Sequence, residues 1–519
     1  MILADDSIGD SSDFSRTSSN QSLASTTLSS KSYEGCSLDE IPACVLERII
    51  AYLPVKDAIS MERASKRCME ASIKSWSLVS RLLLSRDCEG FGKNKPFRNI
   101  HLKSLDVSGI VHLMDDKALG IIGNSCPFLE ELDLSGVRAS WEALGDLSES
   151  LSNLKKLIYK DMENAGDKQL WFLIKGCARS LRFLDLRGCF RLHGRCFRLF
   201  GDQLEHLFLD GCQQVDETAI EDLCTSAVCL KELRINNCCQ ISDENVSLIS
   251  RMLSELQVIT LCGNSFEKLS TAGIAHIGNI TSLVELALDH NPLVNDAFLI
   301  SISKSLKNLK TLSLANSGLD QTVTGKGIIA IAQLKTLEQL DLSSLGAVRS
   351  GVLLEVVYSC RSLSLVQLRN CVYLSDHGVK GMARAANIRH LDLSGSILIT
   401  NDSVQDFIKA FPQDEKKPPV TIVVGGTAVE ASRLTMRGSR VIVDSSDYSS
   451  LMTMSNNCSF KIGTTSDDDY SDNEFEALTT QRSFYIDAKC GEEEQHIEDE
   501  QKLQEWVEGE ARNLGLLGS

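Results

Sequence analysis

The sequence predicts an α/β fold in which strand–turn–helix repeats stack into a curved solenoid. Pairs of apolar residues two positions apart recur at steps of 23 to 28 residues between Leu105 and Leu393. Polar residues or glycine follow each pair, and then apolar residues return at helix spacing, as at Val246, Ile249 and Leu253. One such unit cannot bury its apolar face alone, so the repeats are expected to share a single core.

Twelve pairs set the register of the predicted strands. They are Leu105/Val107, Leu132/Leu134, Leu157/Tyr159, Leu184/Leu186, Leu207/Leu209, Leu233/Ile235, Ile259/Leu261, Leu286/Leu288, Leu312/Leu314, Leu340/Leu342, Val366/Leu368 and Leu391/Leu393. Residues two apart lie on one face of a strand, so each pair points into the core. We expect an inner parallel sheet covered by an outer row of helices.

The repeats resemble the cysteine-containing leucine-rich repeats, and ELRINNCCQISDENVSLIS at 232–250 carries the resemblance well. The resemblance implies a horseshoe-shaped solenoid in which an Asn or Cys after each strand satisfies backbone groups inside the turn. We call this position after each strand the ladder position, because it recurs from repeat to repeat. It holds the expected Asn or Cys at Cys189, Cys212, Cys238, Asn264, Asn291 and Cys371. Other residue types occupy it at Ile110, Val137, Met162, Ser317, Leu345 and Ser396. Local turn geometry should therefore vary along the solenoid.

The 18 cysteines fit this ladder better than a metal site, because no CxxC pair or Cys/His quartet occurs. No metal or cofactor is expected. The chain shows neither an apolar leader at Met1 nor a run long enough to cross a membrane. These features favour a reducing compartment, cytoplasmic or nuclear, and predict no membrane partner.

Two segments precede the solenoid, which we place at 95–444. Residues 1–35 are rich in Ser, Thr, Asp and Asn and are expected to be disordered. Residues 36–82 carry apolar residues at helix spacing, interrupted by Pro42 and Pro54, which suit helix starts. The pattern predicts short helices at about 43–52, at about 56–64 and from 65 onward, which would form a small all-α domain.

This helical segment resembles an F-box through Ile41-Pro42, Leu46, Ile49, Leu53, the segment 54–59 and Ser65-Lys66-Arg67. The resemblance implies that one apolar face docks on a Skp-type adaptor, which joins the chain to a cullin ubiquitin ligase. That face would comprise Ile41, Pro42, Leu46, Ile49, Leu53 and Ile59.

Some residues depart from the F-box pattern. The family usually has Trp where Cys68 stands and Val-Cys where Ala64-Ser65 stand, while Trp76 comes eight residues late. These departures weaken the expected packing of the last helix and bear on adaptor affinity. The alternative is that residues 36–82 only cap the exposed end of the solenoid.

After Leu393 the repeat falters, but Val420–Val424 and Arg440–Val443 read as two further strands that would close the sheet edge. Residues 445–519 then shift to Ser, Asp, Glu and Asn and are expected to be mostly disordered. Within them, Ser466 precedes three aspartates and resembles an acidophilic kinase site. Leu503, Trp506 and Val507 have the spacing of a short amphipathic helix.

The net charge of −17, with a pI near 5.1, argues against a nucleic-acid partner, because such binding needs Lys and Arg to neutralise phosphates. No GxSxG elbow, HExxH or Gly-rich phosphate loop is present. We therefore propose no catalytic residue and expect that the chain is not an enzyme.

The concave face of the solenoid is the expected binding surface, because side chains that alternate with the apolar pairs point into the bowl. Three neighbouring strands would place Phe183, Arg187, His206, Phe208 and Arg234 together there, and Phe and Arg are frequent interface anchors. These five residues are the predicted substrate site. The alternative is that they are merely solvated or packed across strands.

Two functions remain open from the sequence. One is the substrate-recognition subunit of a Skp–cullin–F-box ubiquitin ligase, whose concave face holds a target protein while other subunits transfer ubiquitin. The other is a leucine-rich-repeat scaffold or regulator that meets no ligase. A form gated by a small molecule lacks support, because no long insertion between repeats would build a pocket.

Overall fold

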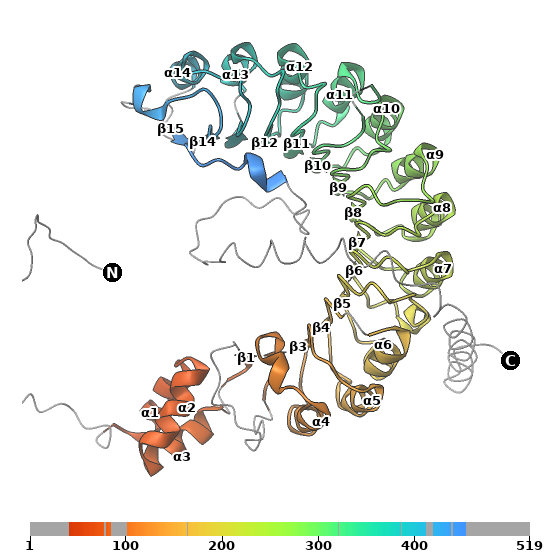
Figure 1. Ribbon diagram of the computed structural model, residues 1–519, viewed down its shortest axis with the longest axis vertical. Helices are drawn as coiled ribbons and strands as arrows, with labels where there is room; N and C mark the ends of the chain where they lie inside the picture. Colours follow the sequence, from red (N-terminus) through yellow and green to blue (C-terminus); the bar gives the residue numbers. More distant parts are fainter. Residues whose placement is uncertain are drawn as a thin grey trace, which may run out of the picture.

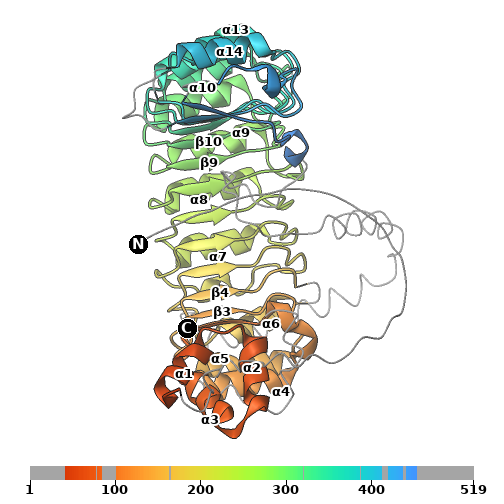
Figure 2. The same cartoon turned by 90° about the vertical axis from the view of Figure 1, so that its left-hand side faces the viewer.

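The structure is a computed structural model that describes residues 41–76, 79–84, 101–162, 165–319, 321–385, 387–411, 419–436 and 440–452. Three helices are followed by a horseshoe whose inner side is lined by strands and whose outer side carries helices (Figure 1). The side view in Figure 2 looks onto the stacked strands. Residues 1–35, Ser466 and the apolar triplet Leu503, Trp506 and Val507 lie outside the described residues.

The strands form one parallel sheet of 15 described strands in sequence order. They are β1 (Arg81–Leu83), β2 (Ser104–Asp106), β3 (Glu131–Asp133), β4 (Lys156–Ile158), β5 (Phe183–Asp185), β6 (His206–Phe208), β7 (Glu232–Arg234), β8 (Val258–Thr260), β9 (Glu285–Ala287), β10 (Thr311–Ser313), β11 (Gln339–Asp341), β12 (Leu365–Gln367), β13 (His390–Asp392), β14 (Val420–Val423) and β15 (Val441–Asp444). The predicted α/β solenoid with an inner parallel sheet is confirmed.

The outer row consists of short helices. They are α4 (Asp116–Ser125), α5 (Trp141–Ser150), α6 (Asp167–Ile174), α7 (Glu217–Ser226), α8 (Asp243–Met252), α9 (Thr271–Ile274), α10 (Asp296–Ser305), α11 (Gly325–Ala330), α12 (Ser350–Ser359), α13 (Asp376–Met382) and α14 (Asn401–Ala410), with 3₁₀ turns η2 (Ser108–Leu113), η3 (Phe197–Leu199), η4 (Ala275–Asn279), η5 (Ile331–Gln333), η6 (Ala431–Arg433) and η7 (Ser449–Met452). The shortest repeat step, from Leu184 to Leu207, contains the short 3₁₀ turn η3 in place of an α-helix.

Local sequence explains where the helices begin. The side chains of Asp115, Ser140, Asp216, Ser242 and Asn295 each accept a hydrogen bond from the backbone N–H three residues on, as N-caps do. These side chains satisfy donors that the first turn of a helix leaves unpaired. The same kind of residue therefore starts a helix once in each of these repeats.

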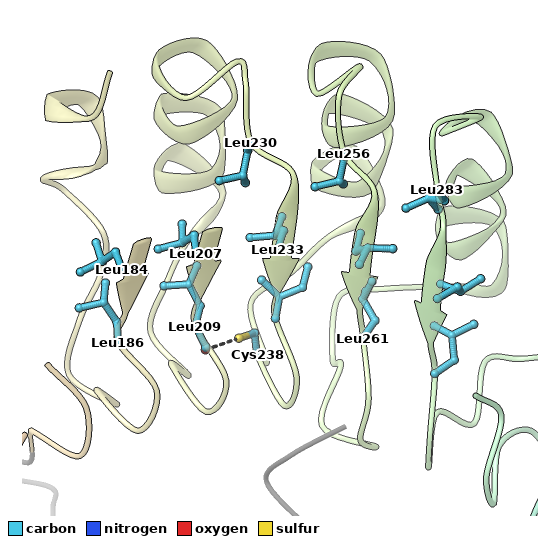
Figure 3. Close-up of a cluster of buried hydrophobic side chains, with 14 of the residues drawn as sticks. Leu184, Leu186, Leu207, Leu209, Leu230, Leu233, Cys238, Leu256, Leu261 and Leu283 are labelled. Carbon is cyan, nitrogen blue, oxygen red and sulfur yellow. Dashed lines mark hydrogen bonds between the residues drawn. The ribbon is translucent and has the colours of Figure 1, made fainter. Parts of the chain in front are cut away.

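One continuous core runs from Leu82 in β1 to Val441 in β15 and is built from the predicted apolar pairs. Figure 3 shows part of it, where Leu184, Leu207 and Leu233 from three neighbouring strands point the same way as Leu230 and Leu256. Their stacking buries each apolar face against the next repeat. This is why a unit that is too small to fold alone is stable in the stack.

The ladder in the turns is confirmed at several positions. The Cys189, Cys212 and Cys238 thiols donate to the carbonyls of Tyr159, Leu186 and Leu209 at 3.1, 3.1 and 3.2 Å, and Figure 3 draws the last of these bonds. Asn291 and Cys371 bond in the same way at 2.9 and 3.5 Å. Each bond links a turn to the repeat before it.

Two ladder predictions are wrong. Asn264 is exposed and does not occupy the inside of its turn. Ser396, which was expected to break the ladder, instead donates to the Leu368 carbonyl at 2.8 Å and accepts from the backbone N–H of Cys371. A serine hydroxyl reaches the same carbonyl as a cysteine thiol does, so the rule that named only Asn and Cys was too narrow.

A second ladder was not predicted. The carboxylate of Asp167, at the start of α6, accepts the backbone N–H groups of His193, Gly194 and Arg195 at 3.0, 2.8 and 2.7 Å. Asp243 accepts from Ser270, and Asp376 accepts from Thr400. Each aspartate thereby holds the backbone that leads into the helical segment of the following repeat.

The two ends of the solenoid differ from expectation. Strand β1 pairs with β2 and was missed, so the sheet starts at Arg81 and not near residue 95. At the other end β14 and β15 extend the sheet as predicted. Residues 445–519 were predicted to be a mostly disordered tail, but residues 445–452 are described and include η7, whose Ser449 carbonyl accepts a hydrogen bond from Asn370. Residues 453–519 lie outside the described part of the chain.

The described part of the chain has no helix that combines the length and apolar character needed to cross a bilayer. All of its described cysteines are free thiols. Across the same ranges, no three His, Cys, Asp or Glu side chains cluster in a way that could hold a metal ion.

Candidate functional site

Neighbouring strands β5, β6 and β7 bring the five predicted substrate-site residues together on the concave face. Phe183 is paired in register with His206, and Phe208 with Arg234. Arg187 follows β5 by two residues, so its side chain lies on the same face of the sheet. We call Phe183, Arg187, His206, Phe208 and Arg234 the concave patch.

Phe208 lies at the centre of the concave patch. Its ring meets the Phe183 ring edge-on, with centroids 4.9 Å apart. The guanidinium carbons of Arg234 and Arg187 lie 4.3 and 5.6 Å from its centroid, within cation–π range. Phe208 is only 8% exposed. The prediction of an exposed Phe208 anchor is therefore wrong, because its neighbours cover the ring.

The two arginines of the concave patch are held by carboxylates of their own strands. Arg187 makes a two-pronged pair with Asp185, with Nε–Oδ1 at 2.9 Å and Nη2–Oδ2 at 2.7 Å. Arg234 donates from Nε and Nη2 to Glu232 Oε1 at 2.7 and 2.6 Å. This hydrogen bonding fixes both guanidinium planes and pairs each arginine with a carboxylate.

His206 completes this network. Its Nδ1 lies 2.8 Å from Glu232 Oε2, while its ring centroid is 5.9 Å from that of Phe183. Burial would raise the pKa of Glu232, but the hydrogen bond from His206 and the charge of Arg234 outweigh burial and lower it. Glu232 is therefore ionised at neutral pH and accepts hydrogen bonds from both Arg234 and His206.

Asp210 lies among these charges but is bonded to neither arginine in the contacts described. Its Oδ1 accepts the backbone N–H of Asn236 at 3.1 Å, whereas its Oδ2 has no hydrogen-bond partner in the described part of the chain. Burial raises the pKa of Asp210 to about 6, although the Asn236 N–H, Arg234 and Arg187 act in the opposite direction. The strand alternation predicts that Asp210 faces the concave side, but Asp210 was not among the predicted substrate-site residues, since nothing in the sequence signals an unpartnered carboxylate.

The residues of the predicted adaptor face differ in burial and do not form one exposed surface. Helices α1 (Ala43–Ala51), α2 (Val55–Ala64) and α3 (Lys66–Ser75) enclose a small core of Leu46, Ile50, Ala58, Cys68 and Ala71. Leu46 is fully buried and cannot contribute to a docking face, which corrects that prediction. Ile41 and Leu53 pack half-buried against this core. The Ile59 side chain lies outside what the structure describes.

The exposed apolar residues of α1 lie on one stripe. Val45 and Ile49 are 44% and 43% exposed, and Tyr52 is 90% exposed. Their spacing of four and three residues places them on one side of the helix. Pro42 is exposed just before them. We call Val45, Ile49 and Tyr52 the α1 stripe. Its spacing is visible in the sequence beside that of Leu46, Ile50 and Leu53, but only the burial of Leu46 and Ile50 shows which row faces solvent.

The departures from the F-box pattern have structural counterparts. Cys68 is buried in the small core, where a thiol fills less space than an indole would. Trp76 contacts both this core and the solenoid core, and its indole N–H donates to Glu62 at 3.3 Å. Trp76 thus joins the helical unit to the first strand region.

No family model matches the chain. The Caenorhabditis elegans protein named "Putative RNA-binding protein EEED8.10" is 54% identical over 536 residues, which cover 100% of this chain and 72% of the relative. F-box/LRR-repeat protein 17 of Arabidopsis thaliana is 24% identical over 331 residues, or 63% of this chain and 50% of that relative.

Solved structures give weaker matches. A chain from the crystal structure of the yeast Rad7 and Elc1 complex aligns with a TM-score of 0.36 and 16% identity, covering 63% of this chain and 92% of that one. A chain from the TLR13–ssRNA13 complex gives 0.40 and 19%, covering 60% and 40%. Scores this low support no functional argument, whereas the identity and coverage of the first relative do decide kinship. The chain belongs to the same family as the C. elegans EEED8.10 protein.

Proposed function

We propose that this protein is the substrate-recognition subunit of a Skp–cullin–F-box type ubiquitin ligase. The α1 stripe binds the adaptor, and the concave face holds the target protein. Ubiquitin transfer is carried out by other subunits that the complex brings close to the target. The protein then needs no catalytic residue and acts in the cytoplasm or nucleus.

The exposure of the α1 stripe carries this proposal. A cap would turn its large apolar side chains toward the solenoid, yet Val45, Ile49 and Tyr52 face solvent, while Trp76 makes the contact with the solenoid core. Exposed apolar side chains grouped on one helix face are typical of a protein-binding surface. The similarity to the Arabidopsis F-box/LRR-repeat protein supports the same reading.

The concave patch supports the second half of the proposal. Its arginines are pre-oriented by Asp185 and Glu232, so little side-chain freedom is lost when a partner binds. Phe183 remains half-buried and offers part of its ring to the bowl. Aromatic and arginine side chains held in this way are typical of the centre of protein interfaces.

Adaptor binding is tested with the full chain in a pulldown with a purified Skp-type adaptor. Ile49→Asp should abolish binding, because it places a charge in the middle of the α1 stripe. Ile329→Asp on α11 is the matched control, since Ile329 is also 43% exposed but lies on the outer helices. If the intact chain does not bind the adaptor, the protein is a scaffold whose helices serve as a cap.

RNA binding is a second candidate, favoured by the name of the EEED8.10 relative and by the Phe and Arg side chains of the concave patch. The net charge of −17 argues against a nucleic-acid partner, and the two arginines are already paired with carboxylates. The 28% of the relative outside the match is another place for its RNA-binding activity. Titration of the full chain with single-stranded RNA at two salt concentrations decides, because phosphate contacts make affinity fall with salt.

A further inference from the structure

Four exposed apolar side chains form a surface that neither function above uses. They come from the turns after β12 and β13: Val372 and Tyr373 are 45% and 56% exposed, and Ile397 and Leu398 are 61% and 48% exposed. The two turns are adjacent, because the Cys371 N–H donates to Ser396 Oγ at 3.1 Å. We call these four residues the apolar edge. Exposed apolar side chains that are grouped in this way usually mark a binding site.

The described chain ends beside the apolar edge. After β15 it turns back along the inner side of the horseshoe, as the blue segment in Figure 1 shows, and reaches η7. The Asn370 side-chain amide donates to the Ser449 carbonyl at 3.1 Å. Asn370 lies two residues before Val372, so the return of the chain brings its end to the turn that carries half of the apolar edge.

Glycines make this close return possible. A Cβ on Gly395 would lie 2.7 Å from Ser449 Cβ, and one on Gly425 would lie 2.2 Å from the Ser446 carbonyl oxygen. Gly395 also has φ of +70°, a conformation that other residues rarely adopt. The path of residues 446–449 is therefore built into the turns after β13 and β14.

The 67 residues after Met452 contain a matching apolar segment. Leu503, Trp506 and Val507 have helix spacing, and Glu505 and Glu508 lie among them. At the rim of the apolar edge, Arg349 lies over the Tyr373 ring with its guanidinium carbon 5.4 Å from the centroid. In the described part of the chain, Arg349 has no carboxylate partner. Its charge complements that of the acidic segment.

The chain between Met452 and Leu503 is long enough for the apolar segment to reach the apolar edge. A flexible coil of 50 residues, the number between Met452 and Leu503, would span roughly 40 Å, which is ample for a site next to Met452. A tethered segment meets such a site at an effective concentration of roughly millimolar, so even a small apolar contact is occupied.

We propose that the segment 502–508 of this chain docks on its own apolar edge through Leu503, Trp506 and Val507. The contact buries the four exposed side chains and pairs Arg349 with a glutamate. It holds the acidic tail along the turns after β12 and β13, away from the concave patch. The inference does not depend on adaptor binding.

Hydrogen exchange of the full chain, followed by mass spectrometry, tests this docking. Peptides covering 501–510 should exchange at least about tenfold more slowly than an unstructured reference peptide. Tyr373→Ser combined with Ile397→Ser should remove that protection, while the control Phe190→Ser should not. Phe190 is 41% exposed and follows ladder residue Cys189 as Val372 follows Cys371.

A reciprocal variant completes the test. Trp506→Ser should speed exchange in the turns 371–374 and 396–399, although it lies far away in sequence. Unprotected exchange of 501–510 in the wild type would overturn the proposal. So would protection that survives the double variant, or protection that disappears on dilution, since the last result would make a second copy the occupant.

Discussion

The Arg234 guanidinium carbon lies 4.3 Å from the centroid of the Phe208 ring. The ring therefore supports the arginine, and the arginine shields the ring from water. This arrangement assigns different tasks to two residues that the sequence placed in one group. Phe208 is the base of the concave patch, whereas Phe183 and the arginines form its surface.

Phe208→Ala should lower the free energy of unfolding by about 3 kcal/mol, because a nearly buried ring is lost and both guanidinium groups lose their support. Phe183→Ala should cost about 1 kcal/mol, since that ring is half-buried. Urea unfolding of the two variants at one pH provides the comparison. Equal, small losses would mean that Phe208 is not structural.

Asp210→Asn should stabilise the protein at pH 7.5 and have little effect at pH 4. The folded-state pKa of about 6 lies above the ordinary pKa of an aspartate, near 3.8, so the folded state holds the proton more tightly. Stability from this group is thus present at low pH and is lost as the pH rises from about 4 to about 6. The full difference is on the order of 3 kcal/mol, and the attraction of Asp210 to the two arginines is already included in it.

Urea midpoints measured for wild type and Asp210→Asn across pH 4 to 7.5 would show this trend. Asparagine retains the oxygen that accepts the Asn236 N–H, so the variant changes the charge and little else. A constant difference between the two proteins at every pH would contradict the raised pKa.

Asp167→Ala should destabilise the solenoid by about 3 kcal/mol. Its carboxylate accepts three backbone N–H groups and is nearly fully buried, so the substitution leaves buried donors without partners. The control is Asp116→Ala, because Asp116 is exposed and accepts the single N–H of Ser140 in the contacts described. Its cost should stay below about 1 kcal/mol, and similar costs for both would refute a ladder role for Asp167.

Leu46→Ala and Ile49→Ala should separate folding from binding in the helical unit. Leu46 fills the small core, so its loss should cost about 2 to 4 kcal/mol and expose α1–α3 to limited proteolysis. Ile49 is 43% exposed, so its truncation should change stability by less than about 1 kcal/mol. Rapid proteolysis of the Ile49 variant would show that this residue is part of the fold.

The sequence predicted the solenoid well because its information is periodic. Each Leu pair is constrained by the repeats before and after it, so an error at one pair would conflict with its neighbours. Strand β1 was missed although Leu82 and Leu84 form an apolar pair that precedes Leu105/Val107 by one repeat step. Ser396 was misjudged because hydrogen-bonding geometry, and not residue type, defines the ladder.

The concave patch was predicted as a grouping but not as a structure. Register alone brings β5, β6 and β7 side by side, so the five residues had to be neighbours. The burial of Phe208 depends on where two long arginine side chains lie, which only their pairing with Asp185 and Glu232 decides. On α1, Leu46 and Ile49 are both apolar, and spacing alone could not say which of the two faces the core.

Trp76 contributes to two hydrophobic cores at once, one in the helical unit and one in the solenoid. The two parts of the protein therefore share a half-buried contact, which restrains the direction in which α1–α3 face relative to the horseshoe. A partner protein bound to the helices would therefore be held at a restrained distance from any protein bound on the concave face. Substituting Trp76 by a small residue would remove this contact and let α1–α3 move relative to the solenoid.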